Sequence, residues 1–523
     1  MNSEDQHFSI NFELQYPIKH EEKFKSSIST IIFRIFHMLE VELKFQISEA
    51  RRNAILKAID PKKSEIIHLQ AKYYDTPDRQ LSQQGAALRQ RLEGTRWIQT
   101  LKAATKSHLE RFEDNIDLGE RSETPFLDLN VYENKPEAFA ILKNALGDKI
   151  EDLQLQFETD IQRTTRVITF EDAEIEISLD VGEVKTETAK QEIYEVEFEL
   201  KSGSIQSLLA FSFEWVKKYQ LWLDVRSKAE FGNLLVLGHK VSPAKLAKEP
   251  QLNKKDTADK NLRGLIANQL QHLLPNIAAI SAQVAEPEHI LQAQTALHHL
   301  HLTLSLFKDW THSKTEKWAH QLSAFESHFK NLQHFEHMQR TLGALLQNPK
   351  TAESLDKDIL YANEKLINLV KSTQNVQHYL ELLMFSLGQS EKPQAHDLKW
   401  FAQNTLQHQY KQLQESLNDA DLSDLESLEA LAQHLNELKF SFPILTNIYD
   451  VKNLQKYAKS LNDAQQACEQ YQVLASSSSY LQQTDLDASD WFALGWLTAK
   501  QEVYAEKLLE ATEQFLVSRK FLK

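Results

Sequence analysis

The segment Gln191–Ser202 reads QEIYEVEFELKS, and in it Glu195, Glu197 and Glu199 alternate with apolar residues. In an extended strand, side chains two residues apart lie on the same face, so the three carboxylates are expected to lie together. Like charges at this spacing repel one another unless cations bind them, and hard cations such as Mg²⁺ prefer carboxylate oxygens. The segment therefore predicts either a metal-binding face or an edge strand with a charged outer face.

The same alternation recurs along other predicted strands of the first half. Arginine and acidic side chains share one face, and apolar side chains share the other. A closed barrel must pack one face against apolar surface, so the charged face is expected to line its interior. An interior that holds both signs of charge suits a polyanion bridged by metal ions. The segments with this pattern are Ala87–Gly94 with Arg89 and Arg91, Leu109–Leu118 with Arg111, Glu113 and Asp117, and Ala173–Val181 with Glu174, Glu176 and Asp180.

Length and composition narrow the class of protein. A chain of 523 residues is too long for one hydrophobic core, so two or three domains are expected. The formal net charge of −15 argues against a nucleic-acid partner, and the single cysteine, Cys468, argues against a disulfide scaffold. We find no signal peptide and no apolar run that would span a membrane, so a cytoplasmic protein without a membrane partner is expected.

The first half is predicted to be rich in strands. Helices are expected over 21–47, 135–147 and 205–219. Residues 240–260 contain two prolines and six lysines without apolar periodicity, which is typical of a linker. Eight or nine antiparallel strands are enough to close a barrel. The expected strands are 8–16, 65–75, 86–94, 96–104, 109–118, 153–162, 165–171, 173–182 and 191–201.

The second half is predicted to be an α-helical bundle, or two bundles in tandem. Apolar residues recur at spacings of three and four, as on the buried face of an amphipathic helix. Residues 261–523 carry 22 Lys and Arg against 30 Asp and Glu, and they hold fourteen of the twenty histidines. The run SSSS at 476–479 is expected to be a loop. The expected helices cover 290–307, 316–346, 353–388, 395–418, 422–440, 447–475 and 488–520.

Several segments of the first half carry a resemblance to a known family. Residues 1–239 resemble a CYTH domain of the triphosphate tunnel metalloenzyme family. The resemblance implies an eight-stranded antiparallel tunnel with flanking helices, in which basic residues grip a triphosphate and acidic residues hold Mg²⁺ or Mn²⁺. The matching segments are YYDTPDRQL (73–81), LRQR (88–91), RFE (111–113), LDVGEVK (179–185), YEVEFELKSG (194–203) and RSKAEFG (226–232).

The resemblance also implies roles for individual residues. By position, the residues that grip the phosphates would be Arg89, Arg91, Lys102, Arg111, Arg163, Lys185, Arg226 and Lys228. The metal side would be Glu13, Glu113, Asp180, Glu195 and Glu197, and of these Glu13, Glu195 and Glu197 would be catalytic.

The first strand departs from the family pattern. The family carries ExExK there, whereas the strand expected at 11–15 reads NFELQ, with Asn11 for the first glutamate and Gln15 for the lysine. Asn and Gln form hydrogen bonds but bring no charge. A lost metal ligand or phosphate contact weakens turnover by orders of magnitude. Binding of triphosphate without hydrolysis is therefore an alternative prediction.

The second half resembles a CHAD domain, a helical module associated with inorganic polyphosphate. The resemblance rests on TALHHLHLTLSLF (295–307) and LQKYAKSLNDAQQA (454–467). Where the family places arginines, this chain has His298, His299 and His301. His298 and His301 are three residues apart, a spacing that presents two imidazoles to one metal ion, but no third ligand follows at a fixed spacing. Exposed histidines and a metal or anion site both remain open.

The sequence as a whole predicts a two-domain protein: a tunnel barrel over 1–239, a linker over 240–260 and an all-α domain over 261–523. The predicted function is metal-dependent hydrolysis of inorganic triphosphate, with triphosphate or polyphosphate as the partner. A non-catalytic sensor or scaffold is one alternative, and a thiamine triphosphatase or an adenylate cyclase is another. Oligomeric state is not predicted.

Overall fold

The computed structural model describes residues 39–517 apart from 106, 309–314, 343–347, 389–396, 449–453 and 485. Its contacts divide the chain into two compact units, and the division cuts through the strand-rich half. The described part of the first unit comprises 39–42 and 73–155, and the second comprises 43–72 and the chain from 156 onward. The expected strand over 8–16 lies outside the described residues.

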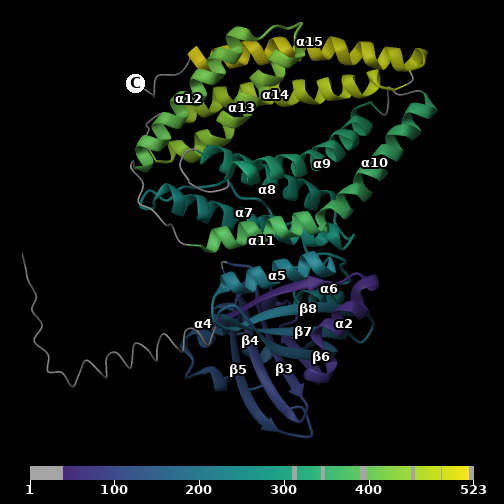
Figure 1. Ribbon diagram of the computed structural model, residues 1–523, viewed down its shortest axis with the longest axis vertical. Helices are drawn as coiled ribbons and strands as arrows, with labels where there is room; N and C mark the ends of the chain where they lie inside the picture. Colours follow the sequence, from purple (N-terminus) through teal and green to yellow (C-terminus); the bar gives the residue numbers. More distant parts are fainter. Residues whose placement is uncertain are drawn as a thin grey trace, which may run out of the picture. The chain divides into compact units, whose positions relative to one another are not determined.

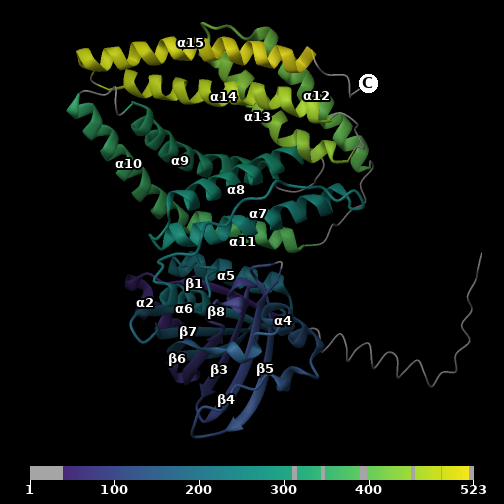
Figure 2. The ribbon, with the colours of Figure 1, turned by 180° about the vertical axis from the view of Figure 1, so that it is seen from behind.

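The strand-rich half forms an eight-stranded antiparallel barrel. Its hydrogen-bonded order is β5-β4-β3-β2-β6-β7-β8-β1, and pairing of β1 with β5 closes it. A two-residue strand, β9 (Trp222–Leu223), pairs with the end of β1. The long neighbours β7 and β8 can be followed side by side in Figures 1 and 2. The barrel strands are β1 (Leu39–Gln46), β2 (Glu65–Asp75), β3 (Ala86–Glu93), β4 (Arg96–Ala104), β5 (Glu110–Glu120), β6 (Gln154–Phe170), β7 (Ala173–Lys185) and β8 (Lys190–Ser202).

Helices cover the apolar faces of these strands within each unit. In the first unit, α4 (Pro136–Leu146) packs its buried leucines and alanines into the core formed by β3, β4 and β5. In the second unit, Phe198 of β8 lies 5.1 Å from Phe211 and 5.2 Å from Trp215 of α5 (Ile205–Tyr219), between ring centroids. Because Phe198 lies between Glu197 and Glu199 on an alternating strand, packing against α5 directs those two glutamates to the opposite face. The remaining short helices are α2 (Arg52–Ile59), α3 (Gln80–Gln83) and α6 (Lys228–Leu237).

The second half consists of long helices with leucine-rich buried faces. The helices α14 and α15 lie side by side along most of their length in both views of the ribbon (Figures 1 and 2). Among the described residues, no helix combines the length and apolar character needed to cross a bilayer. The helices are α7 (Ala258–Ser281), α8 (Pro287–Leu306), α9 (Thr315–Leu342), α10 (Pro349–Val370), α11 (Thr373–Leu387), α12 (Leu398–Asp419), α13 (Leu425–Thr446), α14 (Leu454–Gln482) and α15 (Ala488–Val517).

Most predicted elements are confirmed, and four differ. The helix predicted over 21–47 is wrong for residues 39–46, which form β1 because their charged and apolar residues alternate, and its residues 21–38 lie outside the described part of the chain. The strands predicted at 153–162 and 165–171 are one continuous strand, β6. The single helix predicted over 353–388 is two, since the chain turns at Lys371–Ser372 and Ser372 caps α11.

The predicted serine loop is also wrong. Residues 476–479 belong to α14. Ser476 Oγ donates a hydrogen bond to the carbonyl of Gln472 at 2.9 Å, and Ser477 Oγ donates one to that of Val473 at 2.8 Å. Each hydroxyl bonds back to the carbonyl one turn earlier, which satisfies the serine side chain without breaking the helix.

Candidate active site

The strand β1 carries a charged motif that sequence reasoning missed. It reads LEVELKFQ, so Glu40, Glu42 and Lys44 occupy alternate positions and share one face. The side chains of both glutamates are only 11% exposed, and Lys44 is buried. This run is the ExExK pattern expected for the first strand, and it was hidden because residues 21–47 were predicted to be helical.

In the first unit, charged side chains from β1, β3, β4 and β5 form a cluster that we call the Lys102 group. Lys102 Nζ lies 2.5 Å from Glu40 Oε2 and 3.1 Å from Glu113 Oε2. Lys102 and Glu113 are direct partners in the register of β4 and β5, so backbone pairing fixes this contact. The Lys102 group comprises Glu40, Glu42, Arg89, Lys102, Arg111 and Glu113.

Two arginines complete the Lys102 group. Arg111 Nη1 lies 3.4 Å from Glu42 Oε1, and Arg89 Nη2 lies 3.9 Å from Glu113 Oε1. Arg89 also donates a hydrogen bond from Nη1 to the hydroxyl of Tyr73 at 3.3 Å. Three cations therefore face three carboxylates, and each predicted phosphate-binding cation of this unit's group has an anionic partner within the group.

Burial changes the protonation of these carboxyls. Burial, reinforced by the carboxylates of Glu42 and Glu113, raises the pKa of Glu40 to about 8 against the pull of Lys102. Burial also acts to raise the pKa of Glu113, but Lys102 and Arg89 together hold it below its ordinary value. Glu40 therefore keeps its proton at neutral pH as long as no further cation is present.

In the second unit, a lysine is surrounded by three buried carboxylates in what we call the Lys228 group. Lys228 Nζ, at the first residue of α6, lies 2.7 Å from Asp180 Oδ2, 2.5 Å from Glu195 Oε1 and 2.8 Å from Glu197 Oε1. Arg163 donates from Nε and Nη2 to both oxygens of Asp180, at 2.7 and 2.6 Å, and from Nη2 to Glu197 Oε2 at 2.5 Å. The side chains of Asp180 and Glu195 are completely buried. The five residues of the Lys228 group are Arg163, Asp180, Glu195, Glu197 and Lys228.

The backbone register assembles the Lys228 group. Arg163 of β6 pairs directly with Asp180 of β7, which in turn pairs with Glu195 of β8. Burial acts to raise the pKa of Asp180 and Glu197, but Arg163 and Lys228 hold both below their ordinary values. Burial prevails at Glu195, whose pKa is raised. Arg163 and Lys228, with a further pull from Lys44 on Glu195 and Glu197, thus offset the effect of burial at only two of the three carboxyls.

The Lys228 group fits a divalent cation. One oxygen from each of Asp180, Glu195 and Glu197 lies within 4.8 Å of the others. Two oxygens on opposite sides of an Mg²⁺ ion are about 4.2 Å apart, since each bond is about 2.1 Å long. A small adjustment therefore brings three hard oxygen donors around one ion. Lys228 now contacts the same three carboxylates, so an ammonium group stands where a metal cation would bind.

The structure brings together most of the predicted site residues in these two groups, but not all of them. Arg91 pairs with Glu93, its neighbour on the same strand face. Lys185 is 37% exposed and lies 3.9 Å from Asp160. Arg226 donates from two nitrogens to Asp224, at 3.0 and 2.7 Å. The backbone carbonyl of Arg226 accepts a hydrogen bond from Lys44 Nζ. Glu13 lies outside the described residues.

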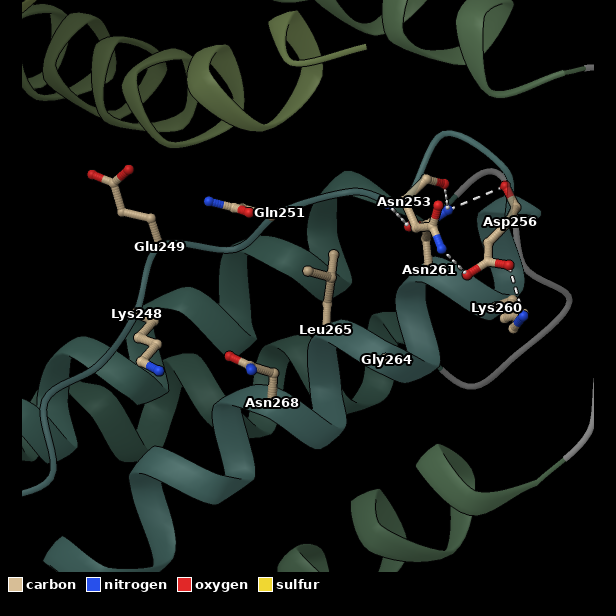
Figure 3. Close-up of a pocket in the computed structure, with 10 residues that line it drawn as sticks. All are labelled: Lys248, Glu249, Gln251, Asn253, Asp256, Lys260, Asn261, Gly264, Leu265 and Asn268. Carbon is tan, nitrogen blue, oxygen red and sulfur yellow. Dashed lines mark hydrogen bonds and ion pairs between the residues drawn. The ribbon is translucent and has the colours of Figure 1, made fainter. Parts of the chain in front are cut away.

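A pocket also lies beside the predicted linker (Figure 3). Its volume is about 560 Å³, and its lining residues are Lys248, Glu249, Gln251, Asn253, Asp256, Lys260, Asn261, Gly264, Leu265 and Asn268. Its polar groups largely bind one another: Asn253 N donates to Asn261 Oδ1 at 2.7 Å and Lys260 Nζ pairs with Asp256 at 2.6 Å. The pocket contains none of the predicted site residues.

The chain is a two-domain protein: a closed antiparallel barrel with buried acidic and basic groups on its strands, followed by a helical bundle. Each of these two domains matches a known protein family. The CYTH domain matches residues 38–230 and the CHAD domain matches residues 264–482. The chain therefore contains a CYTH domain followed by a CHAD domain, as the sequence predicted, and the CYTH match begins just before β1.

Individual relatives are distant. The chain is 35% identical over 170 residues to the inorganic triphosphatase of Haemophilus influenzae, a stretch that covers 31% of this chain and 44% of that protein. The chain thus spans less than half of the length of this curated relative. Among solved structures, it is similar to the CHAD domain of Ricinus communis, with 16% identity, a TM-score of 0.43 and coverage of 53% of this chain and 96% of that one. A Hippeastrum protein described as a candidate adenylyl cyclase with a dominant triphosphatase activity shows 16% identity, a TM-score of 0.28 and coverage of 39% and 98%.

Proposed function

We propose that the chain is a metal-dependent hydrolase that cleaves inorganic triphosphate to pyrophosphate and phosphate. The observation that carries this proposal is the Lys228 group, in which Asp180, Glu195 and Glu197 converge on one cation. Buried carboxylates at this density are costly without cations. The triphosphatase activity of the Haemophilus influenzae relative supports the choice of reaction.

The acidic residues would hold the metal, and the basic residues would hold the phosphates. Asp180, Glu195 and Glu197 would be the ligands of Mg²⁺ or Mn²⁺, and Lys228 would turn from them to phosphoryl oxygens. The ion, when bound, supplies charge neutralisation and polarises the phosphoryl group. Arginine guanidinium groups bind phosphate oxygens in pairs, which suits Arg163 to holding and orienting the substrate.

In the Lys102 group, we propose that Arg89, Lys102 and Arg111 bind phosphoryl oxygens. Glu40, Glu42 and Glu113 keep these cations in place before substrate binds. Of the three acids, Glu40 carries a raised pKa, so it is the one able to exchange a proton with bound phosphate or water near neutral pH. Lys44, whose charge acts to lower the pKa of Glu195 and Glu197, would add a further cation to the Lys228 group.

The alternative of a non-catalytic sensor has two supports, the segment NFELQ at 11–15 and the low number of cations in the helical half. Residues 11–15 lie outside the family match, while β1 within the match carries Glu40, Glu42 and Lys44 in the expected spacing. This spacing supports the hydrolase, while the acidic balance of residues 261–523 stays as support for the sensor. Organic triphosphates stay as alternative substrates and belong in the same assay.

The experiment is phosphate release by the full chain from tripolyphosphate, ATP and thiamine triphosphate, with Mg²⁺ or Mn²⁺ and with chelator. We expect metal-dependent release with tripolyphosphate as the best substrate, and a loss of at least about a hundredfold in the double variant Glu195→Ala, Glu197→Ala. The matched control is Glu183→Ala, Glu192→Ala, which removes another cross-strand glutamate pair from the same two strands.

The outcomes separate the functions. Release that is equal in wild type and in the Glu195, Glu197 variant would sink the proposed site. No release from any substrate, with tripolyphosphate still raising the melting temperature, would leave the sensor. Preference for ATP or thiamine triphosphate would replace the inorganic substrate while keeping the site.

A further inference from the structure

A second convergence of ligating side chains lies in the helical half, between α8 and α9. His298 and His301 of α8 both face Glu326 of α9. His298 Nδ1 lies 3.0 Å from Glu326 Oε1, and His301 Nδ1 lies 3.5 Å from Glu326 Oε2. Each carboxylate oxygen thus has its own imidazole. Glu326 is the third group that spacing along the sequence could not reveal, because it comes from the next helix.

Glu326 is a buried carboxylate that contacts His298, His301 and Lys330. Its side chain is only 1% exposed, whereas those of His298 and His301 are 34% and 26% exposed. Burial acts to raise the pKa of Glu326, but the two imidazoles and Lys330 hold it well below its ordinary value. The carboxylate is therefore ionised, and its charge is directed to the solvent-accessible edge where the imidazoles lie.

We propose that His298, His301 and Glu326 bind a borderline transition-metal ion, with Zn²⁺ as the reference ion. Two imidazole nitrogens and one carboxylate oxygen are a common ligand set for Zn²⁺, Ni²⁺ and Co²⁺, and Mg²⁺ binds imidazole poorly. In a tetrahedral zinc site with bonds of about 2.05 Å, neighbouring ligand atoms are about 3.3 Å apart. The separations of 3.0 and 3.5 Å run to different oxygens of Glu326, and one ligand atom from each of the three residues lies within 4.8 Å of the others. A small adjustment therefore brings all three residues around one ion.

Lys330 is the built-in competitor for this site. Its ammonium lies 2.7 Å from Glu326 Oε1, one turn along α9, and its side chain is 45% exposed. It can therefore swing into solvent when a metal ion takes the carboxylate. The fourth coordination position is then left to water, because both imidazoles are partly exposed. Cys468, the single cysteine, is buried elsewhere and is not a competing ligand.

This site differs from the Lys228 group in chemistry, and the two are separable by experiment. The Lys228 group offers oxygen atoms alone, whereas the α8–α9 site offers nitrogen as well. Excess Mg²⁺ occupies oxygen sites and leaves the imidazoles available. Titration with Zn²⁺ or Co²⁺ in excess Mg²⁺ therefore reports the α8–α9 site, whatever the barrel hydrolyses.

The test is calorimetric titration of Zn²⁺, and optical titration of Co²⁺, into the full untagged chain in excess Mg²⁺. We expect one tight equivalent, a visible Co²⁺ spectrum of a four-coordinate site and an increase in melting temperature on binding. His298→Gln and His301→Gln should each weaken binding by about tenfold or more, since even outer partners of metal ligands contribute that much. His320→Gln, an exposed histidine of α9, is the matched control and should bind as wild type does.

Lys330→Gln distinguishes a metal site from a purely structural ion pair. If Lys330 competes with the metal, its removal should tighten Zn²⁺ binding severalfold. A structural ion pair would give the same variant a lower melting temperature and unchanged Zn²⁺ affinity. Zn²⁺ binding that is equal in wild type, His298→Gln and His301→Gln would overturn the proposal, as would the absence of a tight equivalent.

Discussion

Lys228 Nζ lies 2.5 Å from Glu195 Oε1, and neither side chain is appreciably exposed. The same ammonium contacts two further carboxylates, so one lysine holds three acids together. Removal of one partner from a buried ion pair leaves an uncompensated charge, which is more costly than the pair itself is favourable. The stability of the second unit's barrel strands therefore depends on Lys228 until another cation is present.

Lys228→Met should lower the free energy of unfolding by about 3–5 kcal/mol in chelator, because it exposes Asp180, Glu195 and Glu197 to one another. Mn²⁺ or Mg²⁺ should restore more stability to the variant than to wild type, since the ion replaces the lost ammonium. Urea unfolding with and without metal measures both effects. Lys185→Met, which removes a half-exposed lysine 3.9 Å from its partner, is the control and should change stability little. Equal metal responses in the two variants would contradict a cation site at Lys228.

Glu40 predicts a dependence of stability on pH. Its pKa is raised by burial from 4.5 to about 8, so the folded chain keeps a proton that the unfolded chain releases. Stability should therefore fall as pH rises from about 4.5 to 8 and level off above. Glu40→Gln, which cannot ionise, should remove this contribution and be the more stable protein at pH 9. The measurement is urea unfolding in chelator at pH 6 and pH 9; parallel losses in wild type and variant would contradict it.

Gly182 lies where β7 approaches β6 closely. A Cβ at Gly182 would lie 2.8 Å from Ile161 Cα and would overlap the carbonyl oxygen of Asp160, both of which are backbone atoms that cannot rotate away. Gly182→Ala should therefore lower stability by about 2 kcal/mol or more. Gly264→Ala is the control, because no atom lies within 4 Å of its added Cβ in α7. The control should be stabilised by about 0.5–1 kcal/mol through helix propensity, and thermal unfolding of both variants tests the contrast.

Two assignments of the first-strand motif predict opposite outcomes. If β1 supplies it, Glu42→Gln should reduce tripolyphosphate hydrolysis by about a hundredfold or more, while Glu13→Gln leaves it unchanged. If the segment NFELQ supplies it, the pattern reverses. Steady-state rates at saturating Mn²⁺, with melting temperatures to confirm folding, decide between the two.

Much of the barrel was predictable because its strands alternate strictly. The charged faces of 86–94, 109–118, 173–182 and 191–201 fixed both the element type and the buried acids and bases. The segment 39–46 has the same alternation, but it adjoins residues whose apolar spacing favours a helix. The helical spacing of those residues therefore led to a helix prediction for all of 21–47. A search for ExExK along the entire N-terminal region, in place of the first plausible strand, would have found Glu40, Glu42 and Lys44.

Contacts between elements were harder to predict. Sequence spacing identified His298 and His301 as a pair, but their partner Glu326 comes from the next helix. Spacing likewise could not show that Lys185 of β7 pairs with Asp160 of β6. These pairings depend on how neighbouring segments pack, and a charged residue on a surface turn looks the same in sequence as one in a site. The loop predicted at the serine run 476–479 was wrong for a related reason. Serine hydroxyls can bond to backbone carbonyls within a helix as well as at a helix end.

The pairing of acids with bases in the Lys102 and Lys228 groups has a consequence for the salt dependence of substrate binding. Under the proposed function, each cation of the two groups would give up a carboxylate on taking a phosphate, so ion pairs would be exchanged and their number would change little. Screening by salt weakens the pairs on both sides of that exchange. Affinity for triphosphate should therefore decline with ionic strength much less steeply than it would for five unpaired cations that bind a polyanion. Selectivity among ligands should depend on how well their phosphates replace the carboxylates geometrically, more than on their total charge.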